Sequence, residues 1–472
     1  MLWTDMTPTG LFRSGTVPEF RMFEFGRQLR RAFETPASPP RDGMTGGDAA
    51  LLDLLDLRLL KAEARAADIA AGRISARDPA MRQLDAALVW REVARRSGDA
   101  VALRKAAAAA ESAATKFEAA RRPAGVARAR VEQAFSALLG AELFGDEGLE
   151  AAVIATLTPV AADPGPAGAL ALCGLAGVDG RRALRGGGVE DALAAAGRFE
   201  APLRRLDQAG KGNVALRMAA AEQRAVLADI LAGCGARLKD QPLIDCALRE
   251  LALATGTLDP DYEPLMSARI TAQAGAARAA LAELTADTIA AADGVQQLTD
   301  ALELIPRDHS PLDWTRIQAQ LGQALQTLGE LTDAPRAFDQ ALRCYDRAVF
   351  DLGGETALAL HACVAAGRAN CLGRLAELTG DLAVLDAAEA AMLTDLTARN
   401  PGQDPTAWAL TQLGLARLYE LRVEITGRGD HRLANAAMAY DAALEVFSEQ
   451  GLRSLCDLAA QGLERLRERS EA

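Results

Sequence analysis

The alternation of apolar and polar positions along residues 310–447 predicts paired helices. Apolar residues recur every three or four positions, as on one face of a helix, at Trp314, Ile317, Leu321, Leu325 and Leu328. A polar break follows at 332–335, and a second apolar stripe with the same spacing runs from Phe338 to Val349. Such a hairpin cannot bury both apolar faces alone, so the pattern predicts hairpins that stack on one another.

The pattern recurs at a fixed interval. Trp314, His361 and Trp408 are each 47 residues apart. The same interval separates the Glu-Leu-Thr or Glu-Ile-Thr triplets that begin at Glu330, Glu377 and Glu424. Self-similarity at a period of a few tens of residues is typical of stacked-repeat proteins.

Aspartates extend this interval toward the N-terminus and mark the expected start of the second helix in each pair. They are Asp99, Asp146, Asp240, Asp287 and Asp381, with Asp430 two residues out of step. Because an Asp side chain can accept a hydrogen bond from a free N–H at a helix start, these residues predict N-caps. We therefore expect eight or nine helix pairs between about residue 48 and the C-terminus.

The repeat resembles the tetratricopeptide repeat (TPR), in which Leu-Gly in the first helix precedes Ala-x3-aromatic-x2-Ala in the second. The matching residues are Leu321-Gly322 with Ala341, Tyr345 and Ala348, and Leu413-Gly414 with Ala436, Tyr440 and Ala443. The middle unit has Ala366-Gly367 and Met392 instead. The resemblance implies an all-α, right-handed α–α superhelix with longer helices than the family's 34-residue unit allows. It also implies that first helices line a concave face holding a peptide or helix of a partner protein.

The resemblance assigns polar and aromatic side chains to that concave face. They are Arg269, Arg316, His361 and Trp408 at the family's second position, Gln323 and Arg368 at its ninth, and Gln326 and Tyr419 nearby. Arginines there would pair with carboxylates of an acidic or C-terminal segment. The alternative is that these are ordinary solvated residues, and that His361 is structural.

Residues 1–47 form a separate segment that ends in a Pro/Gly-rich linker. Residues 18–35 predict one helix, and its candidate docking residues are Phe20, Met22, Phe25, Leu29 and Phe33. We expect this helix to cap the array or lie against it. Docking to a partner or to a membrane surface is the alternative, because aromatic and Arg-rich amphipathic helices can lie in an interface. A true start at Met22 is a third interpretation.

The 47-residue repeat cannot be followed between residues 161 and 188, which contain Pro164, Pro166 and many glycines. A glycine inside a helix costs about 1 kcal/mol relative to alanine. We therefore expect an irregular pair or a hinge here, dividing the array into residues 48–200 and 201–472. The charged final helix, 452–469, is typical of a terminal cap.

Composition and net charge limit the classes of function that fit this sequence. Half of the residues are apolar but only 4% are aromatic, which favours an interior of Ala and Leu, and a net charge of −12 argues against nucleic-acid binding. Seven scattered cysteines without a Cys-x2-Cys pair indicate neither a disulfide framework nor a zinc site. The profile, including few Lys beside many Arg, predicts a bacterial cytoplasmic protein, and no apolar run approaches the roughly 20 residues of a membrane span.

The sequence predicts no catalysis, cofactor or metal site. The three histidines are dispersed, and Gly210-Lys211 lacks the other residues of a phosphate-binding loop. We therefore expect a scaffold or adaptor that binds another protein, with self-association also possible. The alternatives are a regulatory sensor closing on a peptide or small ligand about a hinge near residue 200, and a membrane assembly factor anchored by residues 18–35.

Overall fold

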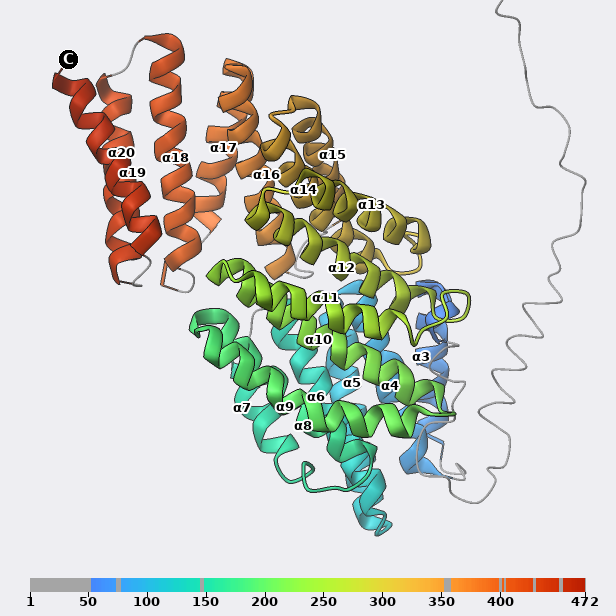
Figure 1. The fold of residues 1–472 in the computed structure, drawn as a ribbon. Coiled ribbons are helices and arrows are strands. Elements are labelled where there is room, and N and C mark those ends of the chain that lie inside the picture. The colour runs from blue at the N-terminus through green and yellow to red at the C-terminus, as the bar shows by residue number, and fades with distance from the viewer. Residues whose placement is uncertain are drawn as a thin grey trace, which may run out of the picture.

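The described part of the chain is entirely helical (Figure 1). The structure, a computed structural model, describes residues 52–73, 78–144, 148–351, 358–398, 401–402, 405–427, 430–449 and 453–471, and these contain eighteen helices and no strand. The predicted N-terminal docking helix lies outside these residues.

Sixteen of these helices form eight antiparallel pairs, each with a first helix (A helix) and a second (B helix). The pairs are α4 (Pro79–Ser97) with α5 (Ala100–Ala119), α6 (Pro123–Phe144) with α7 (Gly148–Leu157), α8 (Pro166–Gly186) with α9 (Val189–Gly210), α10 (Val214–Leu238) with α11 (Gln241–Thr255), α12 (Pro264–Thr285) with α13 (Thr288–Leu304), α14 (Pro311–Thr332) with α15 (Pro335–Asp351), α16 (Leu358–Thr379) with α17 (Leu382–Ala398), and α18 (Pro405–Thr426) with α19 (Asp430–Glu449). Single helices precede and follow them, α3 (Leu57–Ala71) and α20 (Arg453–Glu471).

The helix boundaries repeat every 47 residues. The A helices α12, α14, α16 and α18 begin at 264, 311, 358 and 405, and the B helices α13, α15 and α17 begin at 288, 335 and 382. The predicted all-α array of eight or nine stacked pairs is therefore confirmed, and the described part of the chain is a helical-repeat array with a 47-residue unit.

The predicted aspartate caps are confirmed at four B helices. Asp99 and Asp287 each accept bonds from two backbone N–H groups, at α5 and α13. Asp240 accepts from Leu243 N at 3.0 Å, and Asp381 from Ala383 N at 2.8 Å. Each bond satisfies a donor that the helix itself leaves free.

The small-residue and aromatic positions of the repeat meet between neighbouring pairs. The ring of Tyr345, on α15, lies against Gly322 of its own pair and Gly367 of the next, where an added Cβ would be 3.0 and 2.8 Å from ring atoms. Met392 packs on Gly414 in the same way, and Tyr440 packs on Gly462 of α20. α20 therefore occupies the place of a ninth A helix, as predicted for a terminal element.

The Gly-rich stretch is a complete helix, α8, rather than a break. The next A helix, α10, ends at Leu238, so the 47-residue interval predicts that α8 ends at residue 191. α8 ends five residues earlier, at Gly186, and the repeat does lose its register here. A Cβ at Gly174 would lie 2.6 Å from Leu157 Cδ1, and Gly180 is crowded by the Ile230 side chain. The glycines let α8 approach its neighbours closely, a role that helix propensity alone does not reveal.

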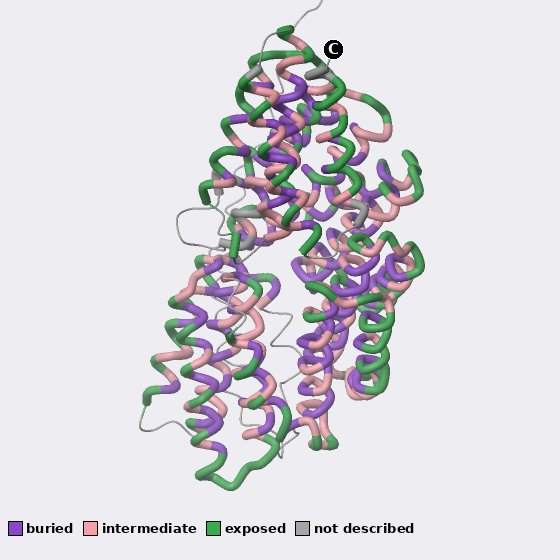
Figure 2. The backbone as a smooth tube through the Cα atoms, turned by 90° about the vertical axis from the view of Figure 1, so that its left-hand side faces the viewer, coloured by how far each residue is buried: buried purple, intermediate pink, exposed green. Residues whose placement is uncertain are grey.

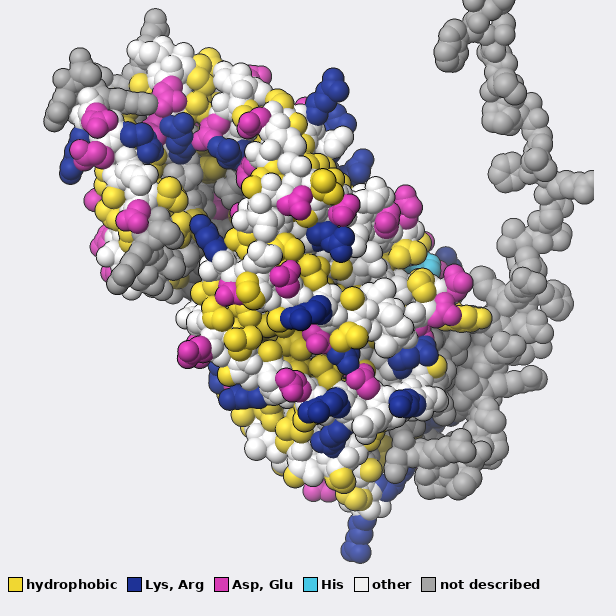
Figure 3. Space-filling view, viewed as in Figure 1, with side chains coloured by type: hydrophobic (Ala, Val, Ile, Leu, Met, Phe, Trp, Pro, Cys, Tyr) yellow, Lys and Arg dark blue, Asp and Glu magenta, His cyan; other side chains and the backbone are white. Residues whose placement is uncertain are grey.

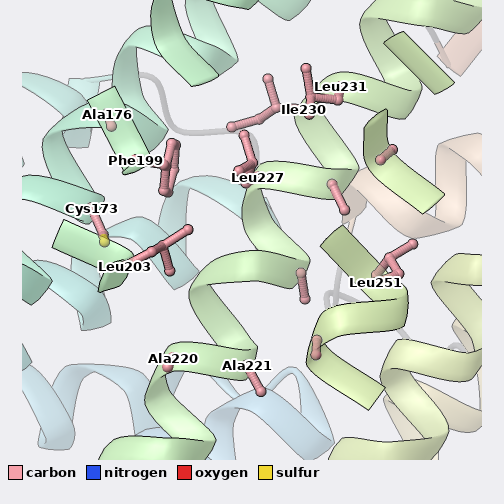
Figure 4. Packing of buried hydrophobic residues seen from close by; sticks show 14 of the residues in the cluster. Cys173, Ala176, Phe199, Leu203, Ala220, Ala221, Leu227, Ile230, Leu231 and Leu251 are labelled. Carbon is pink, nitrogen blue, oxygen red and sulfur yellow. The ribbon is translucent and has the colours of Figure 1, made fainter. Parts of the chain in front are cut away.

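Residue 200, the expected boundary between halves, lies inside α9. Residues on both sides of it share one buried hydrophobic cluster, in which Cys173 and Phe199 lie near Leu203 and Ile230 (Figure 4). The described residues thus show continuous packing from α8 to α12, and a hinge there stays a prediction.

The first part of the array coils through one turn and closes on itself. α4 packs against α14, and α6 packs against α16. α17–α20 project beyond this closed turn (Figure 1), and buried residues follow the sides on which helices meet (Figure 2).

Candidate partner-binding surface

The 47-residue register identifies equivalent positions on successive A helices. Glu222, Arg269 and Arg316 occupy one such position on α10, α12 and α14. Each forms an ion pair across the closed turn: Glu222 with Arg95 at 2.8 Å, Arg269 with Glu92 at 3.3 Å, and Arg316 with Glu142 at 2.8 Å. This position therefore marks the inner face of the coil.

Arg269 is the centre of this ionic network. Its guanidinium lies 2.6 Å from Asp313 Oδ2, and its side chain is 12% exposed while that of Asp313 is 3% exposed. Burial alone would lower the pKa of Arg269, but the carboxylates of Asp313 and Glu92 outweigh burial and raise it. Burial would likewise raise the pKa of Asp313, and Arg269 more than offsets it, so that pKa is lowered. Both groups are charged and held in place.

The same face continues on α16, α18 and α20. The equivalents of Arg316 are Cys363 and Leu410, and Leu458 follows Leu410 after 48 residues because α19 begins one residue late. Leu410 is 44% exposed and Leu458 is 51% exposed. The charged position of the closed turn thus becomes an exposed apolar row in the projecting part of the array.

A second row runs parallel to the first, and each of its members lies seven residues further along the same helix. It consists of Gln323, Asn370, Arg417 and Arg465. Gln323 and Asn370 are exposed amides, and the two arginines are 37% and 42% exposed. The row therefore changes from neutral hydrogen-bonding groups to cations along the array.

A third row explains the repeated acidic triplets of the sequence. Glu330, Glu377 and Glu424 lie on successive A helices, and arginines stand between them. Arg374 pairs with Glu330 at 3.8 Å and with Glu377, and Arg417 pairs with Glu377 and Glu424 at 3.2 Å each. These ion pairs tie neighbouring A helices together and offset repulsion within the acidic row.

The first predicted site residues, Arg269 and Arg316, are on the inner face but engaged within the closed turn. Gln323 is exposed on that face, and Gln326 bonds Glu330 at 3.1 Å. Their role in binding a partner is untested.

The other predicted residues lie two positions off this register. In α16 and α18 the Gly pairs used for alignment, at Gly367 and Gly414, are two residues early relative to the helix boundaries. Arg368 consequently pairs with Asp346 of α15, and Trp408 and Tyr419 pack in hydrophobic clusters. His361 lies in α16.

The alignment to the family's pattern missed Asn370, Leu410 and Arg417. Counting forward from Arg316 and Gln323 in steps of 47 residues identifies all three positions. The triplets beginning at Glu330 show the same interval in the sequence. The interval of the helix boundaries is thus a better guide to the surface than single small residues.

Other kinds of site find no support in the described residues. These contain no group of three or more His, Cys, Asp or Glu placed to hold a metal ion. None of the described helices contains a stretch whose length and hydropathy would suit a membrane span. The face seen in Figure 3 carries acidic and basic side chains interspersed, without a single-sign field.

No protein-family model and no curated protein matches this sequence. The chain is similar to the crystal structure of a Rap protein complexed with competence and sporulation factor, with TM-score 0.45 and 11% identity over 83% of this chain and 99% of that one. It is also similar to BtubC from P. vanneervenii, with TM-score 0.36 and 18% identity over 56% and 92%, and to yeast Tom70, with TM-score 0.25 and 13% identity over 88% and 97%. At these scores the likeness does not extend to function, which is argued from this chain's own geometry.

Proposed function

We propose that this protein is a non-catalytic interaction protein that binds an extended segment of a partner protein along the inner face of α14, α16, α18 and α20. The observation that carries the proposal is the pair of exposed rows on this face, which repeat at the interval of the helices themselves. An extended ligand can meet one such position on each helix in turn.

The chemistry of the rows suits a peptide. The amides of Gln323 and Asn370 can each donate and accept, as pairing with a peptide backbone requires. Leu410 and Leu458 offer apolar contact, and Arg417 can exchange a carboxylate of this chain for one of the ligand.

The spacing defines the length of the segment. Neighbouring packed helices lie about 8–10 Å apart, and an extended chain advances roughly 3.3 Å per residue. One A helix therefore corresponds to about three ligand residues, and four helices to about ten. Backbone pairing is expected over α14 and α16, with apolar and acidic side chains over α18 and α20.

A random 12-residue peptide display library, selected on the full-length protein, tests this function. We expect enriched peptides to contain apolar and acidic residues, and to bind the double variant Asn370→Ala/Leu410→Ser at least about tenfold more weakly. Both residues are exposed, so helicity should be unchanged. Leu393→Ser is the matched control, because it makes the same leucine-to-serine change at an exposed position of the B helix α17.

Two results would reject the proposal. One is the absence of enriched peptides from repeated selections on the wild-type protein. The other is equal peptide affinity for the wild-type protein and Asn370→Ala/Leu410→Ser, measured by fluorescence anisotropy.

A further inference from the structure

A cavity of about 270 Å³ lies on the opposite side of the array, between α13, α14 and α15. Its apolar walls come from Val295, Leu321, Leu325 and Cys344, the last three of them buried. Its polar lining residues are Thr299, Gln340, Arg343 and Arg347. The cavity thus combines an apolar interior with two guanidinium groups on one helix.

The two arginines distinguish α15 from the neighbouring B helices α13 and α17. The positions of Gln340, Arg343 and Arg347 are taken in α17 by Ala387, Ala390 and Thr394, and in α13 by Asp293, Gln296 and Asp300. A helix that packs by the common pattern has no need of two arginines there. Their presence on α15 is a feature of this cavity.

The apolar wall also differs from that of the next pair. The equivalent of Leu321 in the next pair is Arg368, whose long side chain reaches back to Asp346 at 2.7 Å. With the shorter Leu321, the space above α14 stays open. A larger neutral side chain at residue 321 would therefore fill this space.

The two arginines of the cavity have no internal counter-charge among the described residues. No ion pair or hydrogen bond joins Arg343 or Arg347 to a described carboxylate, and Asp346, between them on α15, is engaged by Arg368. Both side chains are exposed. Two guanidinium groups one helical turn apart can bind the same anionic group through charge-assisted hydrogen bonds.

We propose that this cavity binds a small amphiphilic anion, a carboxylate or phosphate ester with a compact apolar body. The apolar body lies against Leu321, Leu325 and Cys344, and the anionic group meets Arg343 and Arg347. This site is separate from the partner-binding surface, because residue 321 points to the B-helix side of α14 whereas Arg316 and Gln323 point to the inner face.

Isothermal titration calorimetry of the full chain tests the site with three eight-carbon probes. Octanoate and octyl phosphate represent the two anionic groups, and octylamine carries the opposite charge on the same chain. We expect both anions to bind with one site per chain and octylamine to bind at least about tenfold more weakly, because its ammonium group would face two guanidinium groups.

Two variants locate the binding. Arg343→Gln/Arg347→Gln, at exposed positions, should weaken octanoate binding at least about tenfold, and Leu321→Trp should abolish it by filling the cavity with a neutral side chain. Arg374→Gln/Arg417→Gln, the same change on the inner face, should leave octanoate affinity unaltered. Circular dichroism establishes that each variant is folded, and the exposed double variant decides the test if Leu321→Trp is not.

The proposal fails if neither anion binds at millimolar concentration, or if octylamine binds as well as octanoate. It also fails if Arg343→Gln/Arg347→Gln retains wild-type affinity. A loss of octanoate binding in Arg374→Gln/Arg417→Gln instead would place the anion on the inner face and overturn the assignment.

Discussion

The Oδ2 atom of Asp53 lies 2.9 Å from the backbone nitrogen of Leu265, although the two residues are 212 positions apart. Asp53 also accepts a bond from Met266 N at 3.3 Å, so it caps the start of α12, where Glu263 makes no side-chain cap of its own. Arg96 holds the other side of this segment by donating to the carbonyls of Leu52 and Leu55 at 2.7 Å. The beginning of the described chain therefore fastens the closed turn.

Replacing Asp53 with asparagine should change how stability depends on pH. Burial, the largest effect, raises the pKa of Asp53 from 3.8 to about 6, against the lowering effect of Arg269. The folded protein thus holds a proton that the unfolded chain loses above pH 3.8, and this contribution to stability disappears as pH rises from about 3.8 to 6. Asparagine stays neutral and keeps an acceptor for the cap.

We expect Asp53→Asn to match the wild type below pH 4 and to be more stable at pH 8, by at most about 3 kcal/mol. Urea unfolding midpoints at the two pH values measure the difference. Asp53→Ala, which also removes the cap, should be less stable than Asp53→Asn by about 1 kcal/mol at both. An Asn variant less stable than the wild type at pH 8 would contradict the account.

Replacing Arg269 with alanine should destabilise the fold. The change leaves Asp313, with a 3% exposed side chain, without its closest cation. Removing one partner of a buried ion pair typically costs about 3–5 kcal/mol.

The double variant Arg269→Leu/Asp313→Leu should recover part of that loss, because the buried carboxylate of residue 313 is removed with its partner and Glu92 keeps its bond from Arg96 at 2.7 Å. Urea unfolding measures all three proteins. Equal stability of Arg269→Ala and the wild type would show that the ion pair is not structural, and would restore Arg269 as a candidate for partner binding alone.

Much of the architecture follows from local signals. The apolar stripe beginning at Trp314 and the cap residues Asp99 and Asp287 depend on chain neighbours within one or two turns of helix. Such features are visible in the sequence because the residues that cause them are close together. The number of pairs follows from their interval.

The closure of the turn could not be predicted in this way. The pairs Asp53–Leu265 and Arg316–Glu142 join residues 212 and 174 positions apart, and their formation depends on how tightly the pairs coil. A small difference in the angle between pairs would separate them. Arg269 therefore seemed available to a partner, whereas the structure engages it internally.

Two glycines on α16 should respond oppositely to alanine. A Cβ at Gly367 would lie 2.8 Å from Cε1 of Tyr345, whereas at Gly373 the nearest atom is Met392 Cε at 3.4 Å. Gly367→Ala should destabilise by about 1–3 kcal/mol through overpacking. Gly373→Ala should be neutral or stabilising by up to about 1 kcal/mol through helix propensity.

Thermal unfolding followed by circular dichroism compares these two variants with the wild type. Because both substitutions are identical and lie in one helix, propensity cancels in the comparison. Similar unfolding temperatures for the two would show that the Tyr345 contact does not restrict the approach of neighbouring pairs.

Replacing Arg465 with alanine should loosen α20. Glu420 is fully buried and accepts bonds from Arg465 at 3.2 Å and from the Tyr440 hydroxyl at 3.0 Å, joining α18, α19 and α20. Loss of one charged hydrogen bond to a buried carboxylate costs about 1.5–3 kcal/mol, and this cost falls on the helix at the end of the array. Amide hydrogen exchange of α20 should therefore quicken while that of α12 is unchanged.

Arg467→Ala is the matched control for that measurement. Its side chain is 74% exposed and pairs with Glu464 on the same helix. Its removal should therefore change the opening free energy that amide exchange measures in α20 by less than about 0.5 kcal/mol. Because Leu458 and Arg465 end the two inner-face rows, a loosened α20 should also weaken any peptide that extends beyond α18. Equal exchange in the two variants would show that Glu420 does not hold α20 in place.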